Sequence, residues 1–202
     1  MNKTGINVLF VYPNTFGMNM LPPAIALFTS ILKKEGHSVD IFDTTYYSIN
    51  YGIDSDGSKM DRLNVVPYSM ESREIRLKST DWKLDLKNKV NKFKPDLIAI
   101  SSTEDMWELG MQILYELKSY KSKNKTPVIV GGAFPTFAPE ICIKEDLVDL
   151  VCVGEGENAL IDLCKKIKNN ENFDDVTNCW VKTIGPEYLK NRNIIRKNPI
   201  SK

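Results

Sequence analysis

Short apolar runs alternate with segments of helical period along most of this chain. The run at residues 6–12 (INVLFVY) is continuously apolar, as expected of a strand that is covered on both faces. Comparable runs occur at 38–42, 96–100, 128–130 and 147–153. This alternation predicts a parallel sheet with helices on both of its faces.

Local signals mark the predicted helices between these strands. Pro22-Pro23 can open the first helix, and Gly36 can take the left-handed conformation that ends it. Apolar stripes at helical spacing predict further helices at 82–93, 106–117 and 157–168, and a short helix is expected near 139–145.

Two segments do not follow this alternation. Residues 44–80 are polar, rich in tyrosine and without a sustained period, so they predict an insertion that forms a surface excursion, a lid or a docking surface. Residues 176–201 contain short β-prone pieces and predict a hairpin or strand pair that leads elsewhere. The expected organisation is a domain at 1–170 followed by an extension at 171–202.

Five strands joined by four crossovers predict a flavodoxin-like α/β sheet with the strand order 2-1-3-4-5. In such sheets ligands bind at the carboxyl ends of the strands, near the switch point between strands one and three. This rule selects the loops after strands one, three, four and five. The candidate binding residues are Asn14, Thr15, Phe16, Gly17 and Met18; Ser101, Ser102 and Thr103; Gly131, Gly132, Ala133 and Phe134; and Gly154, Glu155, Gly156 and Glu157.

Composition narrows the classes of partner. The 202 residues are 42% hydrophobic, and Lys+Arg 27 against Asp+Glu 26 leaves a net charge of +1 with the charges mixed along the chain. This pattern does not indicate a nucleic-acid partner. The chain has no charged-then-apolar leader and no apolar run near the roughly 18 residues of a membrane helix. We therefore expect a cytoplasmic protein with no membrane partner.

The four cysteines and the single histidine do not predict a metal site. The cysteines are too far apart for a CxxC zinc ribbon or a tight iron–sulfur loop. Cys152 and Cys164 lie in apolar segments, where a reduced cysteine packs as a small hydrophobe. His37 lies in the turn before strand two, opposite the candidate loops, and is expected to be a surface or turn residue.

Known functions of this fold can be compared with the candidate loops. A phosphoryl-receiving domain needs a carboxylate after strand three and a lysine after strand five, where this chain has Ser101 and Val153-Gly154. A dinucleotide-binding domain carries GxGxxG after strand one, where this chain has PNTFGM with one glycine. A flavin phosphate would find only Asn14 and Thr15 in that loop, and this alternative stays open.

Each candidate group also has a purely structural explanation. Gly131-Gly132 allows close approach of a ligand to the backbone, or simply forms a strand-to-helix turn. Ser101-Ser102 can bond to the tail of a ligand or cap the next helix. The two acids of GEGE at 154–157 lie at a helix start, where the helix dipole favours negative charge, although a cap explains one acid better than two.

Several segments together resemble a known domain. LPPAIALFTSILKKEGHSVDIFD, KPDLIAISS, PVIVGGAFPTFAPE and VDLVCVGEGENALIDL are similar, in order and spacing, to the cobalamin-binding domain at the amino end of B12-dependent radical SAM enzymes. The resemblance covers roughly residues 6–168. It implies a corrin across the strand ends, contacted by the loops at 14–18 and 154–157. It also implies a nucleotide tail that descends past Ser101-Ser102 and Gly131-Gly132.

Two motifs of related proteins are missing. Many cobalamin domains carry DxHxxG after strand one, with the histidine on cobalt, and PNTFGM lacks it. The resemblance therefore implies cobalamin bound base-off, without a histidine ligand. The CxxxCxxC loop that holds the 4Fe-4S cluster in the S-adenosylmethionine-binding half is also missing. We therefore expect an excised domain whose radical SAM domain, in cis in the whole enzyme, is absent here, or else a free-standing corrinoid carrier.

The implied function is cofactor binding within a radical SAM enzyme. Methyl transfer to an unactivated carbon is the commonest chemistry that the resemblance implies, and cyclisation or rearrangement are the others. No residue of this chain is expected to be catalytic. Two alternatives stay open, which are a non-catalytic flavodoxin-like docking module and a flavin- or nucleotide-binding domain.

Overall fold

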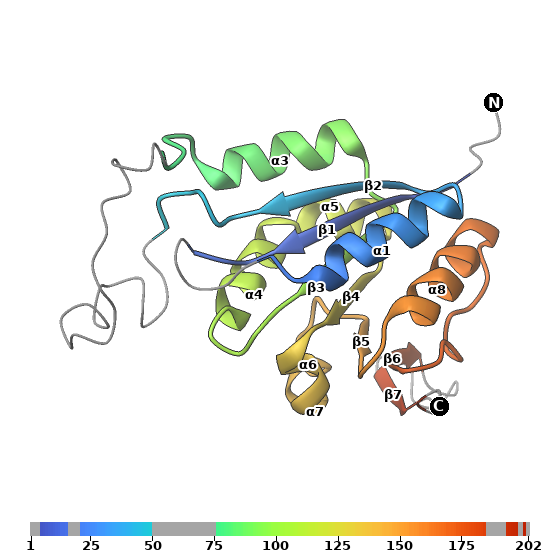
Figure 1. The fold of residues 1–202 in the computed structure, drawn as a ribbon. Coiled ribbons are helices and arrows are strands. Elements are labelled where there is room, and N and C mark those ends of the chain that lie inside the picture. Colours follow the sequence, from blue (N-terminus) through green and yellow to red (C-terminus); the bar gives the residue numbers. More distant parts are fainter. Residues whose placement is uncertain (1–4, 16–20, 50–75, 185–192, 198–199, 201–202) are drawn as a thin grey trace.

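The chain folds around one mostly parallel sheet (Figure 1). A computed structural model describes residues 5–15, 21–49, 76–184, 193–197 and 200. Among these residues, the strand order is β2-β1-β3-β4-β5-β6-β7, so the predicted order 2-1-3-4-5 is confirmed and extended. The strands are β1 (Asn7–Tyr12), β2 (Ser38–Asp43), β3 (Leu97–Ser101), β4 (Val128–Gly131), β5 (Leu150–Cys152), β6 (Cys179–Ile184) and β7 (Asn193–Lys197).

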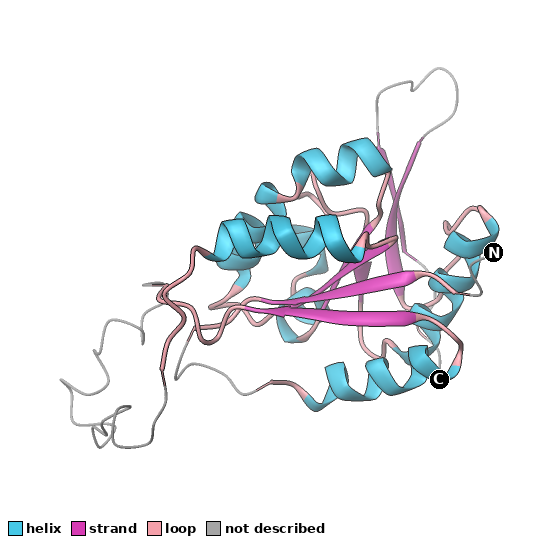
Figure 2. Cartoon of the chain, turned by 90° about the horizontal axis from the view of Figure 1, so that it is seen from above, coloured by secondary structure: helices cyan, strands magenta, loops and turns pink. Residues whose placement is uncertain are grey.

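Helices cover both faces of the sheet, as Figure 2 shows from above. The described helices are α1 (Pro23–Lys34), α3 (Trp82–Phe93), α4 (Trp107–Glu116), α5 (Lys118–Asn124), α6 (Ala133–Phe137), α7 (Pro139–Cys142) and α8 (Glu157–Asn169). None of them is long and apolar enough to cross a membrane.

The sheet separates two hydrophobic clusters, because successive side chains of a strand point to opposite faces. In β1, Leu9 and Val11 pack with the cluster beneath α3, α4 and α7. Val8 and Phe10 of the same strand pack with α1 and α8 on the other face. The continuous apolar run at 6–12 is therefore explained by burial on both sides, as predicted.

The carboxyl-terminal segment forms the predicted strand pair, and this pair also continues the sheet, which was not predicted. β6 pairs antiparallel with β5, and β7 pairs antiparallel with β6. Val176, Cys179 and Val181 are buried in the cluster beneath α1 and α8. The physical reason is that β5 would otherwise be an open edge, whose unpaired backbone groups β6 satisfies.

Three elements differ from the expectation, and one of them is α5, because no helix was predicted at 118–124. α6 was not predicted, because the AFPTFAPE segment contains two prolines and resembles a loop. Pro135 is compatible with α6 because it lies in the first turn, where a backbone N–H has no partner within the helix. β5 spans Leu150–Cys152, shorter than the predicted 147–153.

The predicted insertion begins and ends at one place. Its described ends form an isolated bridge between Tyr47 and Lys78, and the Lys78 N–H donates to the carbonyl of Tyr46 at 2.7 Å. The Tyr47 hydroxyl also donates to Asp85 of α3 at 2.8 Å. These contacts close the excursion at the edge of the sheet, and residues 50–75 lie outside the described part of the chain.

His37 lies before β2, at the amino end of the sheet, as expected, but it is not a surface residue. Its side chain is 6% exposed, and its Nδ1 accepts a hydrogen bond from the Ile6 N–H at 3.2 Å. Burial, with the charge of Lys168 as the next cause, lowers the pKa of His37 below its ordinary 6.5. The neutral imidazole thus joins the start of β1 to the start of β2.

We predict that acid weakens the fold through His37. Because the folded state holds a proton on this residue less well than the unfolded chain does, the free energy of unfolding should be highest above about pH 6.5 and fall below it. Urea unfolding at about pH 7.5 and about pH 5.5 measures this difference. In His37→Gln, whose amide oxygen accepts from Ile6 without titrating, the fall should be smaller; an equal fall in both proteins would contradict the assignment.

Candidate functional site

A cleft lies at the carboxyl ends of the parallel strands, on the face of the sheet that α1 and α8 cover. Its cavity measures about 60 Å³ and is partly open to solvent. Typical ligand pockets span roughly 300–1,000 Å³, so this cavity is the small inner end of an open cleft and not a full-sized pocket. Its lining residues come from four strands and two helices: Phe10, Phe28, Ala99, Ile100, Ser101, Ile129, Gly131, Gly132, Cys152, Gly154, Gly156 and Leu160.

The structure brings part of the predicted set together. Ser101, Gly131, Gly132, Gly154 and Gly156 all line the cleft, although residues 101 and 156 are 55 positions apart in sequence. The other candidates are neighbours of these residues, point elsewhere, or lie outside the described residues, as Phe16, Gly17 and Met18 do.

The start of the loop after β1 is fixed to the end of β2. The Asn14 N–H donates to Thr44 Oγ1 at 2.9 Å, and the Thr44 hydroxyl donates back to the Asn14 carbonyl at 2.8 Å. The Asn14 side-chain amide donates to Thr45 Oγ1 at 2.9 Å, and the Thr45 hydroxyl donates to Asp43 at 2.5 Å. Asn14 and Thr15 are buried. Asn14 therefore holds the loop in place, and neither residue lines the cleft.

The loop after β3 does not cap the helix that follows. α4 begins at Trp107, and its first turn receives no hydrogen bond from a capping side chain. Ser102 is buried and donates its hydroxyl to the Thr103 carbonyl at 2.8 Å, while Thr103 is half-buried. Ser101, also half-buried, lines the cleft. The capping explanation of these residues is thus wrong, and Ser101 is the one of the three placed to meet a ligand.

The structural reasons for a glycine differ between positions 131 and 132. Gly132 has a φ of +105°, and a Cβ there would lie 2.7 Å from the Ser102 carbonyl oxygen and 2.9 Å from the Ser102 nitrogen. Its backbone conformation and this close approach alone explain the glycine. A Cβ on Gly131 would meet only Cys152 Cβ, at an ordinary 3.6 Å. Packing within the chain therefore does not explain why position 131 lacks a side chain.

Ala133 and Phe134 start α6 and do not line the cleft. Phe134 packs against Trp107 with ring centroids 5.3 Å apart, in the cluster on the opposite face of the sheet. The Phe134 N–H donates to the Ser102 carbonyl at 3.4 Å. Phe134 therefore joins the loops after β3 and β4, while Ala133 is exposed beside the mouth of the cleft.

The GEGE turn after β5 forms the other side of the mouth. Glu155 is exposed, and its carbonyl accepts a hydrogen bond from Asn178 Nδ2 at 2.7 Å. Glu157 is half-buried in the first turn of α8, where the helix dipole favours its charge. The buried Gly156 lets Phe28 of α1 pack closely, because a Cβ there would lie 3.0 Å from the tip of the Phe28 ring.

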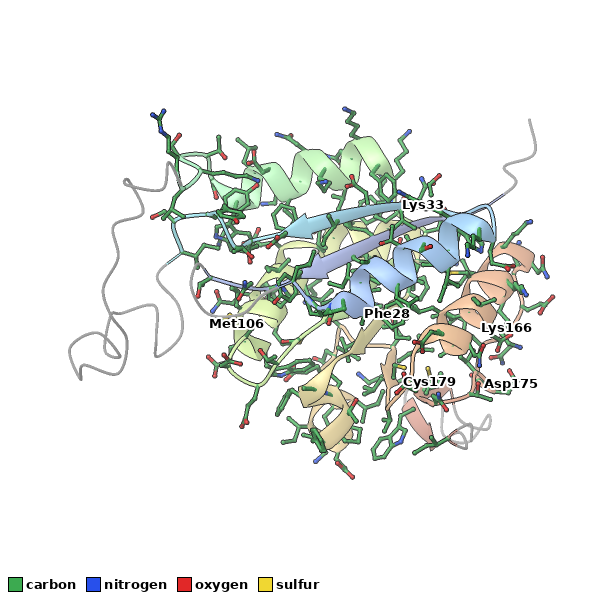
Figure 3. All side chains as sticks on the ribbon, in the orientation of Figure 1. Phe28, Lys33, Met106, Lys166, Asp175 and Cys179 are labelled. Carbon is green, nitrogen blue, oxygen red and sulfur yellow. The ribbon has the colours of Figure 1, made fainter. Side chains whose placement is uncertain are left out.

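The sequence analysis missed the apolar walls of the cleft. Phe10, Ala99, Ile129 and Cys152 occupy one face of four neighbouring strands, and Phe28 and Leu160 face them from α1 and α8. Figure 3 labels Phe28 on α1 and Cys179 beside the strands. The alternation of side chains along each strand contains the signal for these walls, whereas the ligand-binding rule selects only the loops.

The four cysteines are all buried thiols without disulfides. Burial raises the pKa of Cys142 and of Cys164 to about 12. Cys152 and Cys179 are direct partners across β5 and β6, and the hydrogen bond to Cys152, followed by burial, raises the pKa of the Cys179 thiol. Among the described residues, no three His, Cys, Asp or Glu side chains are placed to hold a metal ion. The prediction that Cys152 and Cys164 pack as small hydrophobes is confirmed.

Comparison with known families agrees with this geometry. Residues 72–163 match the family model of the B12 binding domain. This part of the chain is therefore similar to a B12-binding domain. The matched residues include β3, β4, β5 and most of α8, and so most of the cleft.

Solved structures with the same fold come from larger proteins. The chain resembles the radical S-adenosylmethionine methyltransferase TsrM from Kitasatospora setae, solved with cobalamin and a [4Fe-4S] cluster, with a TM-score of 0.68 and 18% identity over 96% of this chain and 31% of that one. It also resembles the cobalamin-dependent S-adenosylmethionine radical enzyme OxsB, with a TM-score of 0.65 and 18% identity over 98% of this chain and 22% of that one.

A curated relative is also much longer than this chain. Cytidylyl-2-hydroxyethylphosphonate methyltransferase of Streptomyces wedmorensis is 23% identical over 158 residues, which are 77% of this chain and 26% of that protein. The chain thus spans less than a third of the length of each of these three proteins.

We predict that alanine has a large effect on stability at one of the two neighbouring glycines and a small effect at the other. Gly132→Ala should lower the free energy of unfolding by about 1–3 kcal/mol, because it combines a strained φ with a close contact to the Ser102 backbone. Gly131→Ala should change it little, because the added carbon makes an ordinary contact. Urea unfolding of both variants against the unaltered chain measures this, and equal losses would contradict the distinction.

Proposed function

We propose that this domain binds cobalamin with the nucleotide tail in the cleft and serves as the cofactor-binding part of a radical SAM enzyme. The corrin would lie across the carboxyl ends of the strands, next to the loop after β1 and the GEGE turn. The tail would pass Ser101 and Gly131 and enter the space between the sheet and helices α1 and α8.

Gly131 is the observation that carries this proposal. Position 131 faces the cleft, its backbone is not in the left-handed region, and a Cβ there would clash with nothing. A missing side chain that neither conformation nor internal packing requires leaves room for a ligand. The family match at 72–163 supports cobalamin as that ligand.

The chain's own residues would bind and position the cofactor. Ser101 can donate a hydrogen bond to the tail at the mouth of the cleft. Asn14 holds the loop after β1, whose members Phe16, Gly17 and Met18 would approach the corrin. Glu155 and Glu157 lie at the other rim, where Glu155 is exposed and able to reach polar groups at the corrin edge.

The cobalt would receive no histidine from this chain. The sequence has a single histidine, His37, which bonds to Ile6 at the amino end of the sheet, while the cleft opens at the carboxyl end. Bound in this way, with its own base in the cleft, the cofactor would be base-off. A cobalt with few ligands suits methyl transfer to a carbon radical, which is the chemistry that cobalamin supplies.

A radical SAM domain in cis would complete the enzyme. It would hold the 4Fe-4S cluster and S-adenosylmethionine, and its substrate would be methylated at an unactivated carbon. Two similar proteins are methyltransferases by name, which supports this reaction over cyclisation or rearrangement. The same proposal includes three further points. The cofactor-binding domain ends near residue 170, segment 44–80 lies near the substrate, and the protein is cytoplasmic.

We predict that the 202-residue chain retains cobalamin through a desalting column after incubation with hydroxocobalamin. The visible spectrum of the retained cofactor should be that of the base-off form. Gly131→Leu should abolish retention, because its side chain would extend into the cleft from a position that tolerates the added carbon.

Ser119→Leu is the matched control, because it introduces the same leucine side chain on the exposed surface of α5, outside the residues that line the cleft. This variant should retain cobalamin. A colourless unaltered protein would overturn the proposal and favour a docking module. Equal retention by Gly131→Leu and the unaltered chain would show that the tail does not pass Gly131.

We also predict the ligand field of the bound cobalt. After reduction to the Co(II) state, the EPR spectrum of the complex should lack the splitting caused by an axial nitrogen. His37→Gln should leave this spectrum unchanged. Nitrogen splitting in the bound state would overturn base-off binding without a histidine.

A further inference from the structure

The inner part of the cleft offers almost no hydrogen-bonding side chains. Of its lining residues, only Ser101 and Cys152 carry a polar side-chain atom, and none carries a charge. Phe10, Ala99, Ile129 and Leu160 belong to the hydrophobic cluster beneath α1 and α8. A group that enters this space is therefore surrounded by hydrocarbon and by backbone that is already paired within the sheet.

Ser101 lies at the mouth and not at the inner end. It is the last residue of β3, paired with Gly131 at the end of β4, and its Oγ would lie 3.3 Å from a Cβ on Gly132. Its hydroxyl can reach a ribose or phosphate that passes the strand ends. It lies two residues further toward the mouth than Ala99, which lines the inner wall.

The Cys152 thiol is already engaged. Its Sγ lies 3.7 Å from the Glu155 carbonyl, to which it donates, and Cys179 is its hydrogen-bonded partner across the strand pair. A thiol is in any case a weak donor and a weak acceptor. Cys152 thus adds polarisable surface to the wall and no strong partner for a polar ligand atom.

Two aromatic rings favour a flat ligand. Phe10 and Phe28 stack with centroids 6.2 Å apart and an angle of 19° between the rings. Phe28 is only half-buried and comes from α1, so it can adjust to a ring placed beside it (Figure 3). Stacked aromatic rings gain energy beyond the area that they bury.

We propose that this cleft selects corrinoids by the base at the end of the nucleotide tail, accepting a dimethylbenzimidazole and disfavouring a purine. The inference rests on the proposed function, since it assigns the cleft to the tail. Both bases are flat and can stack on Phe28. An adenine carries an exocyclic amine and more ring nitrogens, which would lose water in the cleft without finding partners. The two methyl groups of dimethylbenzimidazole would instead gain from contact with Ile129 and Leu160.

The experiment compares three corrinoids on the 202-residue chain by spectral titration. Cobalamin, which carries the benzimidazole, should bind most tightly, and adeninylcobamide should bind at least about tenfold more weakly. Cobinamide, which lacks nucleotide and base, reports the contribution of the corrin alone. Adenine leaves cobalt more readily than benzimidazole does, so the cost of base-off binding works against the expected order and cannot produce it.

Two variants at one position test the source of the selection. Phe28→Gln puts an amide beside the base. It should lower the ratio of the dissociation constants of adeninylcobamide and cobalamin at least about threefold. Phe28→Leu keeps the wall apolar and removes only the ring, so it should weaken both complexes and keep most of the preference. Circular dichroism checks that both variants are folded.

The outcomes separate the two proposals. If cobalamin and adeninylcobamide bind the unaltered chain equally, the selection by the base is wrong, while the binding of corrinoids stands. If Phe28→Leu loses the preference as fully as Phe28→Gln does, ring stacking and not the missing polar partners sets it, which also overturns the inference. If no corrinoid binds, the proposed function itself fails.

Discussion

The carboxyl end of the sheet depends on one contact between two backbones. The loop after β3 and the turn after β4 meet where Gly132 approaches Ser102, and the Ser102 N–H donates to the Gly131 carbonyl at 3.0 Å. A side chain on Gly132 cannot fit there, so both loops keep one course. Because Gly132 makes the turn, Gly131 can end its strand in a regular conformation beside the cleft. Gly132, which the structure requires for the turn alone, thus allows Gly131 to leave the cleft open.

Hydrogen bonds hold the remaining loops around that contact. Thr44 fixes the start of the loop after β1, and Thr136 Oγ1 of α6 accepts from the Gly154 N–H at 3.2 Å. Asn178, just before β6, bonds to the carbonyl of Glu155. The strand that extends the sheet therefore also supports the rim of the cleft. A preformed rim lowers the entropy that a ligand must lose on binding, which is why rigid elements make good sites.

The fold could be predicted from sequence because its signals are local or periodic. Apolar strands, the Pro22-Pro23 start and the Gly36 stop of α1 each follow from short-range physics, and parallel topology follows from their alternation. The partner of β5 could not be predicted, because strand pairing of CWVKT depends on an open edge far away in sequence. α6 was missed because proline signals a turn wherever the helix start is not known.

The same limits applied to the site. Strand ends predicted Ser101, Gly131 and Gly156 in the cleft, since every parallel strand brings its carboxyl end to one edge. The direction of each side chain was not predictable for loop residues, so Phe134 was included although it packs on the other face. The roles of Gly131 and Gly132 could not be separated either, because adjacent glycines look alike until a neighbouring backbone is placed against one of them.

The polar groups at the amino end of the sheet differ from those at its carboxyl end. His37 is used at the amino end, where its neutral imidazole accepts a hydrogen bond from Ile6. The cleft at the carboxyl end offers backbone, the Ser101 hydroxyl, the Cys152 thiol and hydrocarbon, with Glu155 and Glu157 at its rim, and the described residues include no group of side chains able to hold a metal. Such a surface can recognise the shape of a ligand and the polarity of its parts. A metal suited to this surface is one that arrives already coordinated, and a corrin meets that requirement because its ring supplies the cobalt with equatorial nitrogens.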